Sequence, residues 1–563
     1  MELVSALEQL RGRLGGELFP LAIGDAAADR RALRELTGQI DDYLLPRLRD
    51  IDAPLLAVVG GSTGAGKSTL VNSLTGADVA EPGVLRPTTL VPTLAVSPDD
   101  RDWFLGRHVL PGLSRATGDG GPGALRVVTV PGLGPGLALL DAPDIDSVVT
   151  ANRTLAAQLL AAADLWLFVT TAARYADEVP WSFLRSARDR STALAVVLDR
   201  VPPEALDAVS ADLARLLAAN GLGGTQLFTV PEEALPSEKA RLPAEAVAPI
   251  ADWLTGLAAD AAERAKVVRQ TLAGALDSVA ARVPELADAV ERQQEGFDAL
   301  RAIVTASYGS GMAAFDEGMR DGSLLRGEVM ARWQDFIGTG DLMRSLESRV
   351  GWLRDRIVGF FTGRVPVTQL RDALESGVGA LIKGSADGSA ERALEGWSAA
   401  PGGPGLLDGL GAVEAARLGR ASPELPARAE QAVRGWQEFV LDLVRKEGAA
   451  KRTTARVASF GVNGAGLLLM LAVFASTGGL TGLEIGVAGG TTVLSQKLLE
   501  AIFGDQAVRT LTSQAREDLR QRVRDLLDAE SARFTTVLDA AQPPGDTADA
   551  LRAAALEISS EDL

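Results

Sequence analysis

The stretch LLAVVGGSTGAGKSTL (55–70) decides the fold of this chain. Residues 55–60 are a short apolar run that ends at glycines, which predicts a buried strand. Residues 61–68 fit the pattern G-x-x-x-x-G-K-[ST], and a helix is expected to begin directly after them. In such a loop the glycines let backbone N–H groups surround a phosphate, and the helix N-terminus adds partial positive charge. The segment therefore predicts a phosphate-binding loop between a strand and a helix.

This loop supplies most of the predicted nucleotide contacts. Lys67 is expected to contact the β- and γ-phosphates and to act in catalysis, and Ser68 is expected to bind Mg²⁺. A chance glycine-rich turn is the alternative, but it does not explain why a strand precedes the loop and a helix follows it. The nucleotide-binding residues predicted from the loop are Gly61, Ser62, Thr63, Gly64, Ala65, Gly66, Lys67, Ser68 and Thr69.

Two later segments supply candidate magnesium ligands. Residues 86–89 (RPTT) precede the apolar run 91–96, and a threonine there can close over Mg²⁺ and the γ-phosphate. Thr88 is therefore predicted to act in catalysis and to bind the metal, and Thr89 to bind the metal. Asp141 ends another apolar run and is expected to hold Mg²⁺ through water. The alternatives are a Pro-Thr turn at the first segment and a helix-capping or turn-capping role for Asp141.

The order of apolar runs predicts an α/β fold class. Strand-like runs alternate mostly with helix-patterned or loop stretches, which implies a three-layer P-loop domain with a mostly parallel sheet. After about residue 252 the strand signals vanish, and narrow apolar stripes at helical spacing predict an all-α stalk or bundle. The strand-like runs are 55–60, 91–96, 125–130, 137–142, 165–171, 193–199 and 226–230.

The expected domain boundaries follow these changes in pattern. Residues 1–50 carry helical stripes and are expected to join the helical stalk. Residues 51–252 are expected to form the P-loop domain, and residues 253–456 the stalk. Residues 457–500 are expected to form a hydrophobic hairpin, and residues 501–563 the C-terminal stalk helices.

The hydrophobic hairpin predicts contact with a membrane. Between residues 457 and 496 the only charged residue is Glu484. The first leg, 457–476, is about 20 residues long, enough to cross a hydrocarbon core. Basic residues flank both ends, which suits a hairpin that enters the bilayer and returns to the cytosol. The alternative is a buried, Gly/Ala-rich helical hairpin in the core of the stalk.

Composition excludes several classes of function. The 563-residue chain carries a net charge of −18, which argues against broad binding to nucleic acid, because Lys and Arg supply most of that affinity. The chain has no cysteine, so disulfides, thiolate metal sites and cysteine nucleophiles are excluded. Its single histidine, His108, argues against a histidine-based zinc site. The N-terminus lacks the layout of a signal peptide, so a cytosolic start is expected.

The motifs resemble those of P-loop GTPases of the translation-factor class and, more narrowly, of bacterial dynamin-like GTPases, in which long helices and a membrane-contacting tip follow the G domain. The matching segments are GSTGAGKST (61–69), RPTT (86–89) and LLDAPD (139–144). The resemblance implies GTP hydrolysis with Mg²⁺ as cofactor, at the cytoplasmic face of the plasma membrane. It also implies lipid contact through residues 457–500, a homo- or hetero-oligomer with a related GTPase, and no nucleic-acid partner. Membrane remodelling or septation during cell division would be the cellular role.

The chain departs from the family pattern at three places. Asp144 stands where the third motif usually has a glycine whose N–H meets the γ-phosphate, so a carboxylate is brought near the phosphates. The fourth motif, usually Asn-Lys-x-Asp, is DRVP (199–202). Arg200 can stack on a purine face, and Asp199 can accept the guanine bonds only if it is shifted, so both are predicted nucleotide contacts while base selectivity stays open. The catalytic glutamine of dynamins is missing from the loop at 61–68, which implies slow hydrolysis or another way of placing the water.

Two other functions remain open from the sequence. One is a soluble ribosome-associated assembly GTPase, which the loop motifs suit equally well but which the net charge and the apolar hairpin disfavour. The other is a scaffold that binds nucleotide with little hydrolysis, as the altered third and fourth motifs allow.

Overall fold

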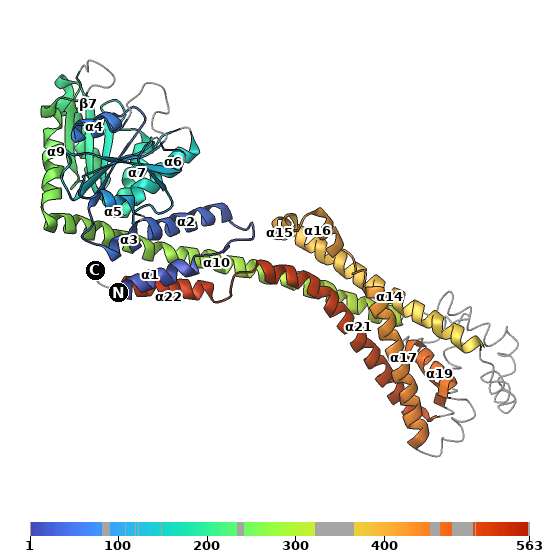
Figure 1. The fold of residues 1–563 in the computed structure, drawn as a ribbon. Coiled ribbons are helices and arrows are strands. Elements are labelled where there is room, and N and C mark those ends of the chain that lie inside the picture. Colours follow the sequence, from blue (N-terminus) through green and yellow to red (C-terminus); the bar gives the residue numbers. More distant parts are fainter. Residues whose placement is uncertain are drawn as a thin grey trace, which may run out of the picture. The chain divides into compact units, whose positions relative to one another are not determined.

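In the computed structural model the chain forms two compact units (Figure 1). The residues described are 2–80, 91–106, 108–118, 120–121, 123–147, 149–233, 241–320, 365–450, 462–475, 499–500 and 503–560. Unit 1 comprises Met1–Phe19, Asp25–Arg292 and Pro543–Leu563, and unit 2 comprises Pro20–Gly24 and Gln293–Gln542. This division differs from the expected one, because most of residues 1–50 group with the sheet-containing unit and not with the helices of unit 2.

Unit 1 contains an eight-stranded sheet with the strand order β3-β4-β2-β5-β1-β6-β7-β8. All neighbouring strands are parallel except β2 and β5, so the predicted mostly parallel sheet is confirmed. Among the strands of the described residues, β3 alone was not predicted from the sequence, because its three residues are exposed or half-buried and form no apolar run. The strands are β1 (Leu55–Gly61), β2 (Thr93–Val96), β3 (Ser114–Ala116), β4 (Ala124–Thr129), β5 (Leu137–Asp141), β6 (Leu165–Thr171), β7 (Ala193–Val201) and β8 (Gln226–Pro231).

Helices cover both faces of this sheet, which makes the three layers expected of the fold (Figure 1). Every residue of β1 is buried, as a central parallel strand requires, and its side chains alternate between the two faces. Leu55 and Val59 pack with α4 and α9, whereas Leu56 and Val58 pack with the cluster that includes α6, α7 and α8. The helices are α4 (Lys67–Thr75), α5 (Arg101–Leu105), α6 (Thr150–Ala161), α7 (Glu178–Asp189), α8 (Leu206–Ala219) and α9 (Ala244–Ala259).

The N-terminal helices of unit 1 share a separate hydrophobic core with helices from distant parts of the chain. Leu7 and Ile40 lie in this core with Val279 and Leu551. The packing explains why residues 1–50 belong to unit 1, since their apolar stripes are covered by segments more than two hundred residues away in sequence. The elements are α1 (Glu2–Arg13), α2 (Ala26–Gln39), the π-helix η1 (Ile40–Leu44), α3 (Leu45–Arg49), the first part of α10 (Ala261–Arg320) and α22 (Thr547–Ser560).

All the regular secondary structure described in unit 2 is helical, as predicted. Two tryptophans lie at the centre of its core, and each donates its indole N–H to a backbone carbonyl: Trp397 to Leu300 at 3.0 Å and Trp436 to Ala515 at 2.7 Å. Because a buried indole N–H needs an acceptor, these two bonds fix how the helices face each other. The helices are the later part of α10, then α14 (Val365–Ala399), α15 (Gly403–Leu410), α16 (Ala412–Leu418), α17 (Leu425–Ala450), α19 (Val462–Ala475) and α21 (Asp505–Ala541).

Helix α19 is the described part of the predicted hydrophobic hairpin. Its side chains from Leu467 to Phe474 are buried in the core of unit 2, where Phe474 meets Trp436 edge to face. For residues 462–475 the structure thus shows the buried helix that sequence analysis named as the alternative. The other residues of the hairpin lie almost entirely outside the described ranges. Within those ranges, no helix combines the length and the apolar character needed to cross a membrane.

Candidate functional site

The phosphate-binding loop joins β1 to α4, as predicted from the sequence. Two of its glycines are required by their surroundings. At Gly61, with φ +153°, a Cβ would lie 2.1 Å from the carbonyl oxygen of Val169 in the neighbouring strand β6. At Gly66, with φ +93°, a Cβ would lie 2.4 Å from Oδ2 of Asp199. A side chain at Gly61 would clash with the backbone of β6, and one at Gly66 would be strained by the positive φ and would displace the carboxylate of Asp199.

Lys67 is the first residue of α4 and lies inside this loop. Its side chain is buried, and its ammonium donates to the carbonyl oxygens of Gly61 at 3.0 Å and Ser62 at 3.1 Å. It also forms an ion pair with Asp144, with 2.5 Å between Nζ and Oδ1. The cation is therefore held at the mouth of the loop, where it can reach a bound phosphate.

Ser68 and Asp141 lie next to each other at the end of β5. The Ser68 hydroxyl donates to Oδ2 of Asp141 at 2.7 Å. The other carboxylate oxygen, Oδ1, is buried and has no hydrogen-bond partner among the described residues. A buried, unpaired carboxylate oxygen beside a hydroxyl suits the water shell or coordination sphere of a hard cation such as Mg²⁺, so the residues present fit the predicted metal.

Burial also changes the proton affinity of Asp141. Its side chain is fully buried, and this desolvation raises its pKa from 3.8 to about 6, although the hydrogen bond from Ser68 and the charge of Lys67 oppose the shift. A carboxyl group whose pKa rises on folding binds more protons in the folded than in the unfolded chain between these two values. Asp141 therefore lowers the free energy of unfolding progressively as the pH rises from about 4 to about 6.

We predict that Asp141→Asn removes this pH dependence. Above pH 7 the amide avoids a buried charge, so the nucleotide-free variant should be more stable than the wild type by about 2–3 kcal/mol, the equivalent of two pKa units. Near pH 4 the two proteins should be equally stable, because Asp141 is then protonated in the wild type. Denaturant unfolding at several pH values measures the difference, and a gap that does not change with pH would contradict the assignment.

A second group at the loop was not predicted from the sequence. The backbone N–H and the hydroxyl of Thr63 both donate to Oδ1 of Asp146 at 2.7 Å. Arg174, from the turn after β6, pairs with Oδ2 of Asp146 at 2.9 Å and donates to the Thr63 carbonyl at 3.2 Å. Burial raises the pKa of Asp146, but the bonds from Thr63 and the charge of Arg174 outweigh it and hold the pKa below its usual value. The sequence held a partial indication of this group. Asp146 and Arg174 each follow a predicted strand, and the carboxyl ends of parallel strands meet at one edge of the sheet.

The altered fourth motif also lies against the loop. Asp199, near the end of β7, is buried beside Gly66, and desolvation raises its pKa to about 6. Arg200 has a positive φ of 53° and a half-exposed side chain, whose Nε lies 3.9 Å from Oδ2 of Asp199. The structure thus places the carboxylate of Asp199 next to the loop backbone and leaves the guanidinium of Arg200 accessible from solvent.

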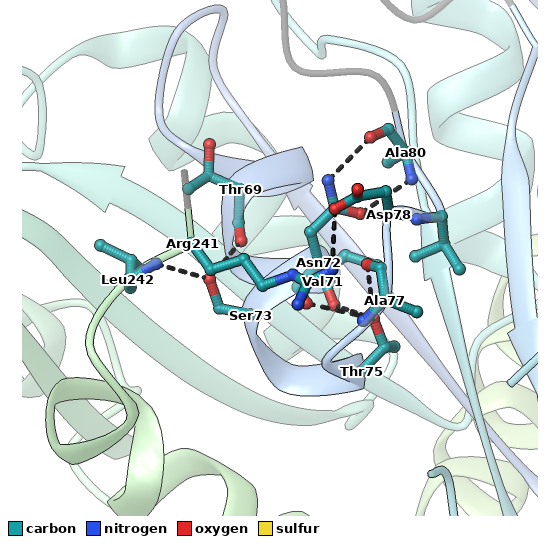
Figure 2. A network of polar contacts seen from close by, with 11 residues as sticks. Thr69, Val71, Asn72, Ser73, Thr75, Ala77, Asp78, Ala80, Arg241 and Leu242 are labelled. Atoms are coloured by element: carbon teal, nitrogen blue, oxygen red, sulfur yellow. Dashed lines mark hydrogen bonds and ion pairs between the residues drawn. The ribbon is translucent and has the colours of Figure 1, made fainter. Parts of the chain in front are cut away.

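A buried asparagine on α4, Asn72, holds the backbone of the residues that follow this helix (Figure 2). Asn72 accepts hydrogen bonds from the backbone N–H groups of Val79 and Ala80 at 2.9 Å, and it donates to the Ala80 carbonyl at 2.7 Å. The hydroxyl of Ser73, on the same helix, accepts from the N–H of Leu242 at 2.9 Å. The helix that begins at the loop is therefore tied to the residues that lead toward 86–89. Thr88 and Thr89 themselves lie outside the described residues.

The structure brings most of the predicted site residues together. The side chains of Lys67, Ser68, Asp141 and Asp199 all meet the loop at the carboxyl ends of β1, β5 and β7. The hydroxyl of Ser62 is buried, with no hydrogen-bond partner in the part of the chain that the structure describes. The loop also includes Thr63, Gly64, Ala65 and Gly66, and Thr69 follows in the first turn of α4, where its carbonyl accepts from Ser73.

Comparison with known proteins gave a likeness in structure alone. No family model and no curated protein matches the sequence. Solved structures of an oligomerised bacterial dynamin pair, described as providing a mechanism for long-range sensing and tethering of membranes, match nearly the whole chain. The match to one of these structures has a TM-score of 0.42 and 10% sequence identity, and it covers 100% of this chain and 95% of the solved chain. The match to another has a TM-score of 0.43 and 11% sequence identity, and it covers 99% of this chain and 95% of the solved chain. Along almost its whole length, the chain is thus similar to structures of a bacterial dynamin pair.

Proposed function

We propose that this chain binds and hydrolyses GTP with Mg²⁺. The observation that carries the proposal is the convergence of Lys67, Ser68 and Asp141 on one glycine loop between a buried strand and a helix. Lys67 binds the β- and γ-phosphates, and the loop N–H groups hold the β-phosphate. Ser68 and Asp141 would hold Mg²⁺, which when bound would supply charge neutralisation for the phosphates. Guanine is proposed as the base, with the accessible guanidinium of Arg200 stacking on it.

We also propose where in the cell this chain hydrolyses GTP. The apolar segment around Glu484 supports a dynamin-like role in which nucleotide state is coupled to membrane association and remodelling, with septation during cell division as the proposed process. The chain would act at the cytoplasmic face of the plasma membrane, as a homo-oligomer or with a related GTPase. Thr88 and Thr89 would then order over Mg²⁺ only in the triphosphate state.

A nucleotide-binding scaffold with little hydrolysis is the second candidate. One observation favours it: the carboxylate of Asp144 already pairs with Lys67, the cation that a γ-phosphate needs. The loop also has no glutamine to place the attacking water.

Phosphate release distinguishes the two candidates. Wild-type protein with Mg²⁺ should release phosphate from GTP faster than from ATP, and Ser68→Ala should reduce the rate because the metal loses a ligand. Ser182→Ala, at an exposed serine on α7, is the matched control and should behave as the wild type. If the wild type releases no more phosphate than Ser68→Ala, the hydrolase proposal fails and the scaffold remains.

Liposome co-sedimentation tests the membrane part of the proposal. The full-length protein should be used, because deleting the hairpin would also remove α19 from the core of unit 2. Pelleting with vesicles that depends on a non-hydrolysable GTP analogue supports coupling between nucleotide and membrane. Absence of pelleting with guanine analogue, with adenine analogue and without nucleotide would contradict it.

A further inference from the structure

The ammonium of Lys67 has no donor left for a phosphate. An ammonium group carries three N–H donors. Three acceptors are in place around Nζ: the carbonyl oxygens of Gly61 at 3.0 Å and Ser62 at 3.1 Å, and Oδ1 of Asp144 at 2.5 Å. A phosphate oxygen that binds Lys67 must therefore displace one of these three atoms.

The carboxylate of Asp144 is the acceptor that can be displaced. The Gly61 and Ser62 carbonyls belong to the backbone of the phosphate-binding loop, and their positions are fixed by β1 and by the turn itself. Asp144 reaches Lys67 through a side chain that is 19% exposed and can rotate toward solvent. The oxygen of Asp144 thus occupies the place of a phosphate oxygen.

The displaced carboxylate cannot move far, because the backbone on each side of it is held. The N–H of Ala142 donates to the Val59 carbonyl at 3.2 Å, and the N–H of Ile145 donates to the Gly61 carbonyl at 3.4 Å. Pro143 restricts the chain between them. The Cα of Asp144 therefore stays near Lys67, and the displaced carboxylate can move no farther away than the reach of its short side chain.

We propose that Asp144 is a specificity-determining residue that makes this site prefer a nucleoside diphosphate to a nucleoside triphosphate. The inference rests on the proposed function and deepens it. Because the lysine of such a loop contacts the β- and γ-phosphates, a γ-phosphate would lie beside Lys67 and so beside the Asp144 carboxylate that pairs with it. The extra phosphate therefore meets the like charge of Asp144, which a diphosphate largely avoids.

The expected size of the preference is that of the repulsion between two like charges at close range. Like charges about 4 Å apart near a protein surface repel strongly enough to change affinity by at least about tenfold. With Mg²⁺ present in both cases, the wild type should therefore bind GDP at least about tenfold more tightly than a non-hydrolysable GTP analogue. The product of hydrolysis would then remain bound, and its exchange for triphosphate would limit the cycle.

Replacing Asp144 tests the proposal. Asp144→Asn keeps the shape and removes the charge, and Asp144→Gly restores the residue usual in the third motif. Both should tighten binding of the GTP analogue by about tenfold while changing GDP affinity much less. Asp102→Asn is the matched control, because it removes one carboxylate from an exposed position of unit 1. Calorimetry with GDP, with the GTP analogue, and with pyrophosphate and tripolyphosphate as base-free probes gives the affinities.

The outcomes separate this inference from the proposed function. A diphosphate preference that disappears in Asp144→Asn and Asp144→Gly but persists in Asp102→Asn supports the inference. If the wild type binds the GTP analogue as tightly as GDP, and neither Asp144 variant changes the ratio, the inference is overturned while the proposed function stands. If the wild type binds no nucleotide and no polyphosphate, the proposed function is overturned and the inference falls with it.

Discussion

Lys67→Ala is expected to remove nucleotide hydrolysis and to weaken GDP binding by about a hundredfold or more, since loss of one buried charged donor at such a site has effects of this size. In the variant the ammonium group that pairs with Asp144 and would face the phosphates is gone. The site therefore loses an attractive charge and keeps the repulsive carboxylate of Asp144.

The control for this variant is another lysine of unit 1. Lys266 lies on the exposed surface near the start of α10, where it is 3.8 Å from Glu263, so Lys266→Ala removes the same side chain without touching the site. Phosphate release and calorimetry of wild type, Lys67→Ala and Lys266→Ala measure the effect. Equal GDP affinity in all three proteins would show that nucleotide does not bind at this loop.

Asp164→Leu is expected to destabilise unit 1 by about 3–5 kcal/mol, because it leaves a buried arginine without its counter-ion. Asp164 precedes β6 and is fully buried, and it pairs with Arg47 of α3, which is 3% exposed. The same carboxylate accepts from the N–H of Leu56 in β1 at 2.7 Å, while Arg47 donates to the Pro54 carbonyl at 2.8 Å. This ion pair thus attaches the N-terminal helices to the central strand of the sheet.

The double variant tests whether the loss arises from the unpaired charge. Arg47→Met with Asp164→Leu removes both charges and should recover much of the stability, since well-packed apolar groups often replace a buried ion pair at little cost. Glu178→Ala, which breaks an exposed pair with Arg185, is the control and should change stability by about 1 kcal/mol or less. Hydrogen exchange of β1 and β6 amides measures unit 1 alone. Equal losses in the single and double variants would contradict the explanation.

The sequence predicted mainly those parts of the site whose residues are neighbours in the chain. The strand 55–60, the glycines and Lys67-Ser68 are consecutive, so their relative positions follow from the backbone of one loop. Asp141 was identified because it ends an apolar run. Asp146 and Arg174 were missed because they meet Thr63 only when strands far apart in sequence become neighbours in the sheet.

In the helical half of the chain, too, the sequence predicted the helices but not what they pack against. The stripes of residues 1–50 predicted helices but did not show what covers them, and the structure packs them with α22 and the start of α10. The apolar stretch 462–475 suits a bilayer or a protein core equally well, because both remove the same side chains from water. Its place in the core of unit 2 follows from the helices that contact it, which no local pattern specifies.

What the sequence by itself determined is the class of the fold, the phosphate-binding loop and the residues that stand there, since periodicity and short motifs reflect local backbone geometry. The tertiary structure alone decided how these residues are paired. Asp144 reads in the sequence as a departure from a motif, but its contact with the ammonium of Lys67 depends on β5 lying beside β1. Charges interact through space, so their effect on function follows from the folded arrangement and not from their spacing along the chain.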